Sequence, residues 1–394
     1  TDAVAARIES DVPLGAFLSG GIDSSTVTAL LKKTVGGLDT FTIGFGDPRF
    51  DEAPFAAAIA RHLGTHHTAL EVGEQDVLDT VARLPAIYDE PFADPSALPT
   101  LLLTKMTRGH VTVALSGDGG DETFGGYRRY RLHMMEERMR GSLPEGLRRP
   151  LFGLLGRVYP KADWAPRMFR AKTTFEGMAR TSVEAYFHSM SLVREPLRSR
   201  LYSSRFRSEL GGYSARDVFE RHARRAGTDD GLALIQYIDL HTYLVGDINT
   251  KVDRASMAHS LEVREPLMDH PLVEWAATLP SHLKLRGGNG KHFFKKAMEP
   301  HLPADVLYRP KMGFAVPLAR WFRGPLRQRV RSSLLAGPLL EGGWLEPAVV
   351  REIVDEHQSG LRDHSTPLWT LLMFDAFLRH AMGEASRPAV PVAA

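Results

Sequence analysis

The sequence contains no cysteine among its 394 residues. Disulfides, thiolate metal sites, cysteine nucleophiles and persulfide sulfur carriers are therefore excluded together. The sequence also lacks any run of about 18 apolar residues that could span a membrane, and its N-terminus lacks the charged and then apolar layout of a secretory signal. These absences predict a cytoplasmic protein without a membrane partner.

An excess of charge of one sign is also missing. The chain carries 49 basic and 47 acidic side chains, which gives a formal net charge of +2. No basic face for nucleic acid is indicated, so the composition favours an enzyme that acts on small molecules. The hydrophobic share of 43% permits a large core, although length alone does not decide between one large domain and several smaller ones.

The first 130 or so residues alternate short apolar runs with amphipathic stretches, which is typical of a parallel sheet covered by helices. This pattern predicts an α/β fold. The expected strands are Leu14–Leu18, Thr40–Phe45, Thr68–Val72 and Val111–Leu115. The expected helices between them are Ser24–Lys33, Glu52–Leu63 and Ala97–Arg108.

From about Glu136 onward the strand signals fade, and this half of the chain is expected to be largely helical. Helices are predicted near Gly231–Val245, Thr250–His259 and Pro271–Thr278. Residues 138–225 are rich in arginine and aromatic side chains but show no interpretable motif, so we expect a helical scaffold there.

The segment Ser19–Ser25, with the sequence S-G-G-I-D-S-S, lies between an apolar strand and a helix. Gly20 and Gly21 let backbone N–H groups approach an anion, and the helix adds its positive N-terminal end. Asp23 would repel a bare anion, so we interpret it as a ligand of a Mg²⁺ ion that bridges to phosphate. A simple connecting turn is the alternative for a lone S-G-G, whereas the whole segment predicts a pyrophosphate loop. No Walker-type lysine follows, which disfavours kinase or ATPase chemistry.

A second loop, S-G-D-G-G-D-E-T-F-G-G-Y at residues 116–127, follows the strand that ends at Leu115. Ligands bind at the carboxyl ends of strands in open α/β sheets. Asp118, Asp121 and Glu122 would repel one another without a cation, which favours metal binding. A structural calcium loop is the alternative, but the spacing does not match an EF-hand.

Two further blocks stand downstream, D-I-N-T-K-V-D-R-A-S-M-A-H-S-L-E-V-R-E-P-L-M-D at Asp247–Asp269 and R-P-K-M-G-F-A-V-P at Arg309–Pro317. With the two loops, and in this order, they resemble the synthetase part of the asparagine synthetase family. The resemblance implies an adenine nucleotide alpha hydrolase-like PP-loop fold over residues 1–384. Within it, residues 1–135 would form the nucleotide-binding core, residues 136–384 the mainly helical part, and residues 385–394 a flexible tail.

The resemblance also implies roles for individual residues. Asp23 and Asp121 match the Mg²⁺-binding carboxylates of the family. Lys311 matches a catalytic lysine whose charge would stabilise the α-phosphate and the tetrahedral intermediate, although outside its motif it would be an exposed loop lysine. Leu18, Ile43 and Gly117 match positions whose backbone holds the adenine in the family. All the residues expected to bind ATP and pyrophosphate are Leu18, Ser19, Gly20, Gly21, Asp23, Ser24, Ser25, Ile43, Ser116 and Gly117.

Some positions differ from the better-studied members. Asp118 stands where some members carry glutamate, and either carboxylate could deprotonate ammonium as a catalytic base. Residues 89–99 replace a segment that carries threonine and arginine beside the substrate, so the identity of the acceptor carboxylate stays open. The charged residues of 251–264 fit a substrate-side network and a structural ion network equally well. The substrate-side candidates are Glu122, Tyr127, Lys251, Arg254 and Arg264.

The resemblance implies ATP- and Mg²⁺-dependent conversion of aspartate to asparagine, with AMP and pyrophosphate as products. Ammonia would come free or through a separate glutaminase domain or subunit, because we expect the family's N-terminal glutaminase domain to be absent from this chain. Relatives that close β-lactam rings, cyclise lasso peptides or amidate cell-envelope sugars are the alternatives. An RNA-modifying PP-loop protein fits less well, because its sulfur-transfer members need cysteines and a basic face. A homodimer is left open.

Overall fold

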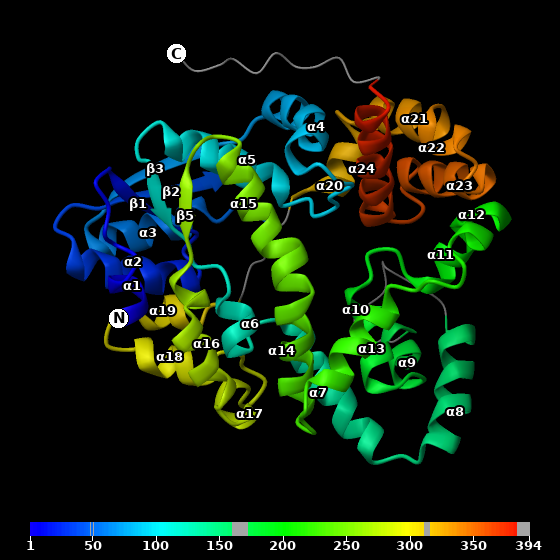
Figure 1. The fold of residues 1–394 in the computed structure, drawn as a ribbon, viewed down its shortest axis with the longest axis horizontal. Coiled ribbons are helices and arrows are strands. Elements are labelled where there is room, and N and C mark those ends of the chain that lie inside the picture. Colours follow the sequence, from blue (N-terminus) through cyan, green and yellow to red (C-terminus); the bar gives the residue numbers. More distant parts are fainter. Residues whose placement is uncertain (48, 50, 160–171, 311–315, 384–394) are drawn as a thin grey trace.

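A five-stranded parallel sheet forms the centre of the N-terminal part of the molecule (Figure 1). The computed structural model describes residues 1–47, 49, 51–159, 172–310 and 316–383. The strands lie in the order β3-β2-β1-β4-β5, and every neighbouring pair is parallel. The predicted α/β fold is thereby confirmed. The strands are β1 Leu14–Phe17, β2 Asp39–Gly44, β3 His66–Glu71, β4 Val113–Leu115 and β5 Glu262–Arg264.

The strand order brings the two glycine-rich loops to one place. The chain runs outward from β1 through β2 to β3 and then returns to β4 on the other side of β1. The direction of winding therefore reverses between β1 and β4. In open α/β sheets, the crevice at the carboxyl ends of the strands at such a reversal is where ligands bind. One predicted loop leaves β1 at this edge and the other leaves β4.

Strand β5 is the one strand of the sheet that the sequence patterns do not predict. It has only three residues, and none of them is fully buried. Its position depends on pairing with β4, because Glu262 N donates to Thr112 O and Ser116 N donates to Arg264 O, both at 2.9 Å. A segment from the mainly helical part of the chain therefore completes the sheet beside the second loop.

The helices that cover the sheet follow the apolar spacing of the sequence. The three predicted helices are confirmed as α2, α3 and α5, with ends that differ by no more than two residues. The sequence does not predict helix α4, because this helix contains Pro85, and proline is unfavourable in helix interiors. The bounds are α1 Asp2–Ala5, α2 Ile22–Thr34, α3 Ala53–Leu63, α4 Glu74–Tyr88 and α5 Ala97–Arg108.

The predicted helix at 231–245 is divided in the structure. Thr242, with φ −129° and ψ −71°, ends α14, and a π-helical turn, η2, then leads into α15. Such turns are frequent at functional sites. This part of the chain contains α6 Gly120–Phe124, α7 Arg128–Gly141, α8 Glu145–Val158, α9 Lys172–Met178, α10 Ser182–Met190, α11 Glu195–Leu201, α12 Ser204–Glu209, α13 Arg216–Arg225, α14 Gly231–His241, η2 Leu244–Asn249 and α15 Thr250–Met257.

The remaining helices pack against the earlier part of the chain in two groups. They are the 3₁₀ turn η3 Pro266–Met268, α16 His270–Ala277, α17 Ser281–Lys284, α18 His292–Met298, α19 Ala304–Leu307, α20 Leu318–Arg323, α21 Arg327–Leu335, α22 Pro338–Glu341, α23 Pro347–Gln358 and α24 Ser365–Ala381. In Figure 1, α20 and α24 lie beside α4, where Phe322 and Trp369 belong to one apolar cluster. A second cluster joins α2 and β4 to α16, α18 and α19. The two clusters hold late segments of the chain around the loops.

The described residues include no helix that is both long and apolar enough to cross a membrane. The predicted tail at 385–394 lies outside the described residues.

Candidate active site

The first loop folds tightly over the start of α2. Gly20 has a φ of +71°, and a Cβ atom there would lie 2.7 Å from Ala56 N, so the turn requires glycine. Ser19 N donates a hydrogen bond to Ser24 Oγ at 3.1 Å, and the two hydroxyl oxygens are 3.0 Å apart. Gly21 is extended and immediately precedes α2. A turn of this kind at a helix N-terminus is a ready binding site for phosphate.

The residues expected at the adenine lie near the carboxyl ends of β1, β2 and β4. Leu18 and Ile43 are buried, and Ser25 is buried within α2. Gly117 approaches the first loop so closely that a Cβ atom would lie 2.5 Å from Ser24 N. The structure thus brings these backbone positions to one edge of the sheet, while adenine binding by them stays a prediction.

The second loop is built around the short helix α6. Gly119 precedes this helix and Gly125 follows it, with φ values of +85° and +73° that favour glycine. Ser116 Oγ donates a hydrogen bond to Asp118 Oδ2 at 2.5 Å, which orients the Asp118 carboxylate at the end of β4. Burial and the negative charge of Asp118 raise the pKa of Glu265 to about 7. The predicted base therefore lies in an acidic environment.

Asp23 of the first loop and Asp121 of the second loop lie on either side of one ammonium group. Lys291 Nζ is 2.7 Å from Asp121 Oδ1, and it also donates a hydrogen bond to Asp23 Oδ2. Burial disfavours the charge of Lys291, but the two carboxylates raise its pKa. Sequence reasoning missed Lys291, whose only signal is the glycine-rich run G-G-N-G-K that it ends.

The two carboxylates fit a Mg²⁺ ion that arrives with phosphate. They converge from adjacent strands on a single positive charge, and glycines leave room for them. A Cβ atom at Gly126 would lie 1.9 Å from Asp121 Oδ1, and one at Gly120 would lie 2.5 Å from Asp23 Oδ1. The described residues contain no group of three or more metal-binding side chains. Two carboxylates are enough for Mg²⁺, because this ion commonly takes its other ligands from substrate phosphates and water.

Glu122 lies in a buried aromatic environment behind this pair. Its Oε1 accepts a hydrogen bond from the Tyr127 hydroxyl at 2.6 Å, and burial raises the pKa of Glu122 to about 7. The Arg129 guanidinium lies 3.5 Å from the centre of the Tyr127 ring and donates to the buried Asp239 at 2.6 Å. The structure thus brings the two predicted substrate-side residues of this loop together, supported by an arginine–aspartate pair that the sequence did not indicate.

Lys251 is buried on α15 and is held by the segment that precedes α5. Its Nζ lies 3.0 Å from both Asp94 Oδ2 and Ser96 Oγ. Burial and the nearby Asp94 raise the pKa of Asp247, which lies one turn earlier in η2. Lys251 therefore joins residues 89–99 to the third sequence motif, Asp247–Asp269, while its substrate role stays a prediction.

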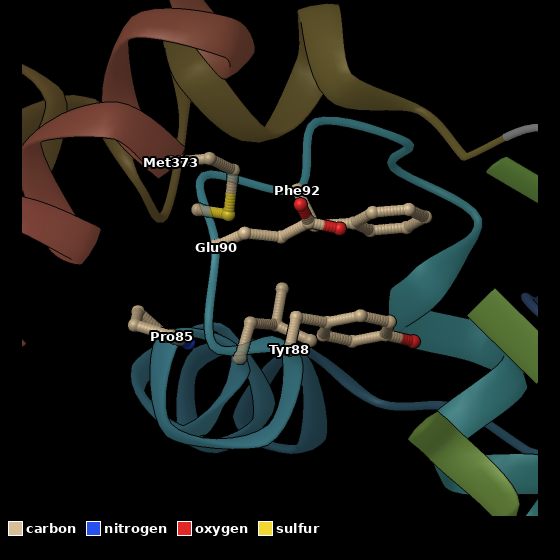
Figure 2. Close-up of a pocket in the computed structure, with 6 residues that line it drawn as sticks. Pro85, Tyr88, Glu90, Phe92 and Met373 are labelled. Atoms are coloured by element: carbon tan, nitrogen blue, oxygen red, sulfur yellow. The ribbon is translucent and has the colours of Figure 1, made fainter. Parts of the chain in front are cut away.

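Residues 89–99 are anchored by stacked aromatic rings (Figure 2). The rings of Tyr88 and Phe92 stack with centroids 4.5 Å apart, and Tyr88 also donates a hydrogen bond to Lys251 O at 3.1 Å. A small cavity beside this stack contains none of the predicted site residues. It is lined by Leu84, Pro85, Tyr88, Glu90, Phe92 and Met373.

The two arginines of the predicted substrate side have other contacts. Arg254 pairs with Asp89 at 3.5 Å, and both side chains are substantially exposed. Arg264 pairs with Glu262 at 2.6 Å, and it donates to the backbone carbonyls of Arg7 and Glu9. The contacts of Arg264 correspond to the structural ion network that the sequence left as an alternative. Its substrate role stays a prediction.

Lys311 lies outside the described residues, but the start of its motif does not. Arg309 donates a hydrogen bond to Gly20 O at 3.2 Å and pairs with Glu52 at 3.4 Å. Its guanidinium also lies 4.0 Å from the centre of the Phe55 ring. The fourth sequence motif therefore begins in contact with the first loop.

Comparisons with known proteins identify relatives along nearly the whole chain. The family model described as asparagine synthase matches residues 1–379. Asparagine synthetase 1 (glutamine-hydrolyzing) of Bacillus subtilis is 31% identical over 373 residues, which cover 95% of this chain and 57% of the relative. A putative asparagine synthetase (glutamine-hydrolyzing) of Mycobacterium tuberculosis is 36% identical over 399 residues, covering 99% of this chain and 59% of the relative.

A more distant relative, named amidase chry2, from Gibberella zeae is 21% identical over 390 residues, with 90% of this chain and 56% of the relative covered. The chain thus spans little more than half the length of the relatives it matches. Because the family model covers nearly the whole chain, and two relatives exceed 30% identity along it, the chain belongs to the asparagine synthase family.

Proposed function

We propose that this chain is an ATP- and Mg²⁺-dependent synthetase that converts aspartate to asparagine through β-aspartyl-AMP. The observation that carries the proposal is the meeting of two acidic, glycine-rich loops at the carboxyl ends of β1 and β4, where Asp23 and Asp121 face one positive charge. A phosphate-binding turn beside paired carboxylates suits a nucleotide that brings a metal ion. Membership of the asparagine synthase family supports the same reaction.

The first loop serves the adenylation step. The β-carboxylate of aspartate attacks the α-phosphorus of ATP, and pyrophosphate leaves. The turn at Ser19–Ser25 would hold this pyrophosphate through backbone N–H groups and hydroxyls. Asp23 and Asp121 would hold Mg²⁺, which neutralises phosphate charge when it is bound.

The second loop serves amide formation. Ammonium gives a proton to Asp118, which Ser116 orients, and the resulting ammonia attacks the acyl carbon while AMP leaves. Lys311 would stabilise the negative charge that develops at the α-phosphate and on the tetrahedral intermediate. The contact of Arg309 with Gly20 O supports this role, because it joins the start of the lysine motif to the pyrophosphate loop.

The nitrogen donor is free ammonia or ammonia released from glutamine by a glutaminase domain or subunit. The asparagine synthetases of B. subtilis and M. tuberculosis are named as glutamine-hydrolyzing, and this chain spans 57% and 59% of their lengths. The 394 residues contain no cysteine, so hydrolysis by a cysteine nucleophile would require another domain. We also propose that residues 1–384 form one synthetase-type domain, in which residues 1–135 are the nucleotide-binding core.

A second candidate function keeps adenylation and changes the acceptor. Residues 89–99 contain no arginine, and Lys251, a buried cation that contacts this segment, is already bonded to Asp94 and Ser96. A different carboxylate, such as a β-amino acid, a peptide side chain or a sugar acid, would then replace aspartate. The distant relationship to a protein named as an amidase supports this option.

An ATP–pyrophosphate exchange panel tests both candidates. Purified full chain is incubated with labelled pyrophosphate, ATP, Mg²⁺ and one carboxylate at a time. Exchange with aspartate alone supports asparagine synthesis, and exchange with another carboxylate but not aspartate supports the second candidate. Asparagine formed from aspartate with ammonia completes the test. Cleavage of ATP to ADP and phosphate would contradict adenylation.

A further inference from the structure

We propose that Lys291 is a built-in counter-ion of the metal site, which occupies the position between Asp23 and Asp121 until a metal–nucleotide complex displaces it. The inference rests on the proposed function for the identity of the metal, and it concerns how the two loops stay together before a nucleotide binds.

The contacts of Lys291 join the two loops. Its ammonium group bonds Asp23, which belongs to the loop after β1, and lies 2.7 Å from Asp121, which belongs to the loop after β4. The exposed fractions of the three side chains are 4% for Lys291, 19% for Asp23 and 15% for Asp121. Carboxylates brought together with so little access to water repel each other, so a cation between them stabilises the closed arrangement of the loops.

The backbone at Lys291 is also specialised for this position. Lys291 has a φ of +56° and a ψ of 33°, a left-handed conformation that non-glycine residues seldom adopt, immediately before α18. Two glycines permit its approach. A Cβ atom at Gly126 would lie 2.1 Å from Lys291 Cε, and one at Gly290 would lie 2.5 Å from Gly125 O. The unfavourable left-handed backbone at Lys291 therefore places its side chain between the two carboxylates.

This arrangement makes Lys291 a competitor of free metal ions. An ammonium group and Mg²⁺ cannot share the same pair of carboxylates without strong repulsion. Mg²⁺ alone must therefore displace Lys291 and leave its charge buried, whereas Mg²⁺ with ATP brings phosphate oxygens that can accept the displaced ammonium. The apparent affinity for free Mg²⁺ equals the intrinsic affinity multiplied by the fraction of molecules in which the site is open, so it is low while Lys291 fills the site. The metal consequently binds together with the nucleotide rather than before it.

The test compares Lys291→Met with the wild-type chain in the absence of nucleotide. Methionine keeps the unbranched shape and most of the length of the side chain, and the same backbone conformation, but removes the charge. We expect Mg²⁺ to leave the wild-type melting temperature unchanged and to raise that of Lys291→Met by about 3 °C or more. Calorimetry should show Mg²⁺ binding at least about tenfold tighter in the variant. The matched control is Lys284→Met, which removes another buried lysine whose Nζ contacts the neutral Gln236 at 3.0 Å.

The same response to Mg²⁺ in all three proteins would overturn the proposal. If Lys291→Met does not fold without Mg²⁺, the double variant Lys291→Met with Asp121→Asn decides the question. The double variant should be more stable than Lys291→Met, because the repulsion between the carboxylates is gone, and a double variant that is no more stable would overturn the proposal. The melting and calorimetry experiments use no ATP. They can therefore contradict the counter-ion role of Lys291 while pyrophosphate exchange still supports the proposed function, and the opposite outcome is equally distinguishable.

Discussion

Replacing Asp239 with alanine should destabilise the fold by breaking a buried network behind the second loop. Asp239 is completely buried on α14. Its Oδ2 accepts hydrogen bonds from Arg129 at 2.6 Å, from Tyr130 at 2.7 Å and from Tyr186 at 2.6 Å. The same Arg129 guanidinium lies against the Tyr127 ring, so the network supports the side chain that donates a hydrogen bond to Glu122 in the candidate site.

The size of the effect follows from the charge that remains. Asp239→Ala leaves the Arg129 guanidinium, which is only 19% exposed, without its buried counter-ion. Breaking a buried ion pair by removing one partner costs about 3–5 kcal/mol of unfolding free energy. Asp239→Asn keeps an acceptor oxygen and the volume but loses the charge, so a smaller cost of about 1.5–3 kcal/mol is expected. Adding Arg129→Met to Asp239→Ala should recover part of the loss, because no buried charge is then left unpaired.

Urea unfolding followed by circular dichroism measures these differences. Asp229→Ala, a change of an exposed aspartate shortly before α14, is the control and should stay within about 0.5 kcal/mol of wild type. Asp239→Ala within about 1 kcal/mol of wild type would refute the reasoning. An additive double variant would also refute it, because additivity means that Arg129 and Asp239 do not stabilise each other.

Three further predictions concern the metal site, the catalytic lysine and the pH dependence of stability. Asp23→Asn and Asp121→Asn should abolish Mg²⁺-dependent pyrophosphate exchange while circular dichroism stays native, and near-normal exchange in either would remove the metal assignment. Lys311→Ala should lower amide formation about 10²–10³-fold with ATP affinity unchanged in calorimetry, and Lys311→Arg should rescue poorly; equal losses of rate and affinity would contradict this role. The pKa of Glu265 is about 7 in the folded state, against 4.5 for an ordinary glutamate in the unfolded chain. The folded state therefore binds the proton more tightly, and the free energy of unfolding should fall as the pH rises from about 4.5 to about 7. Glu265→Gln should remove this part of the fall, up to about 3 kcal/mol, in urea unfolding measured across that range.

The sequence alone determined the elements whose signals are local. The first four strands follow from short apolar runs bounded by glycine, aspartate or proline, and their observed ends lie within about two residues of those predicted. The first loop could be predicted because Gly20 and Asp23 stand close together in the chain, between a strand and a helix. Asp118 and Asp121 could be assigned to a binding edge because a loop after a parallel strand must leave the sheet at its carboxyl end.

Only the tertiary structure decided which distant residues complete the site. Lys291 stands 268 positions after Asp23, and Lys251 stands 157 positions after Asp94, so no local period or spacing connects the members of either pair. The three-residue strand β5 likewise has no apolar run of its own and exists through its pairing with β4. Such contacts depend on how whole helices pack around the sheet, and on charges that become strong partners only when folding removes them from water.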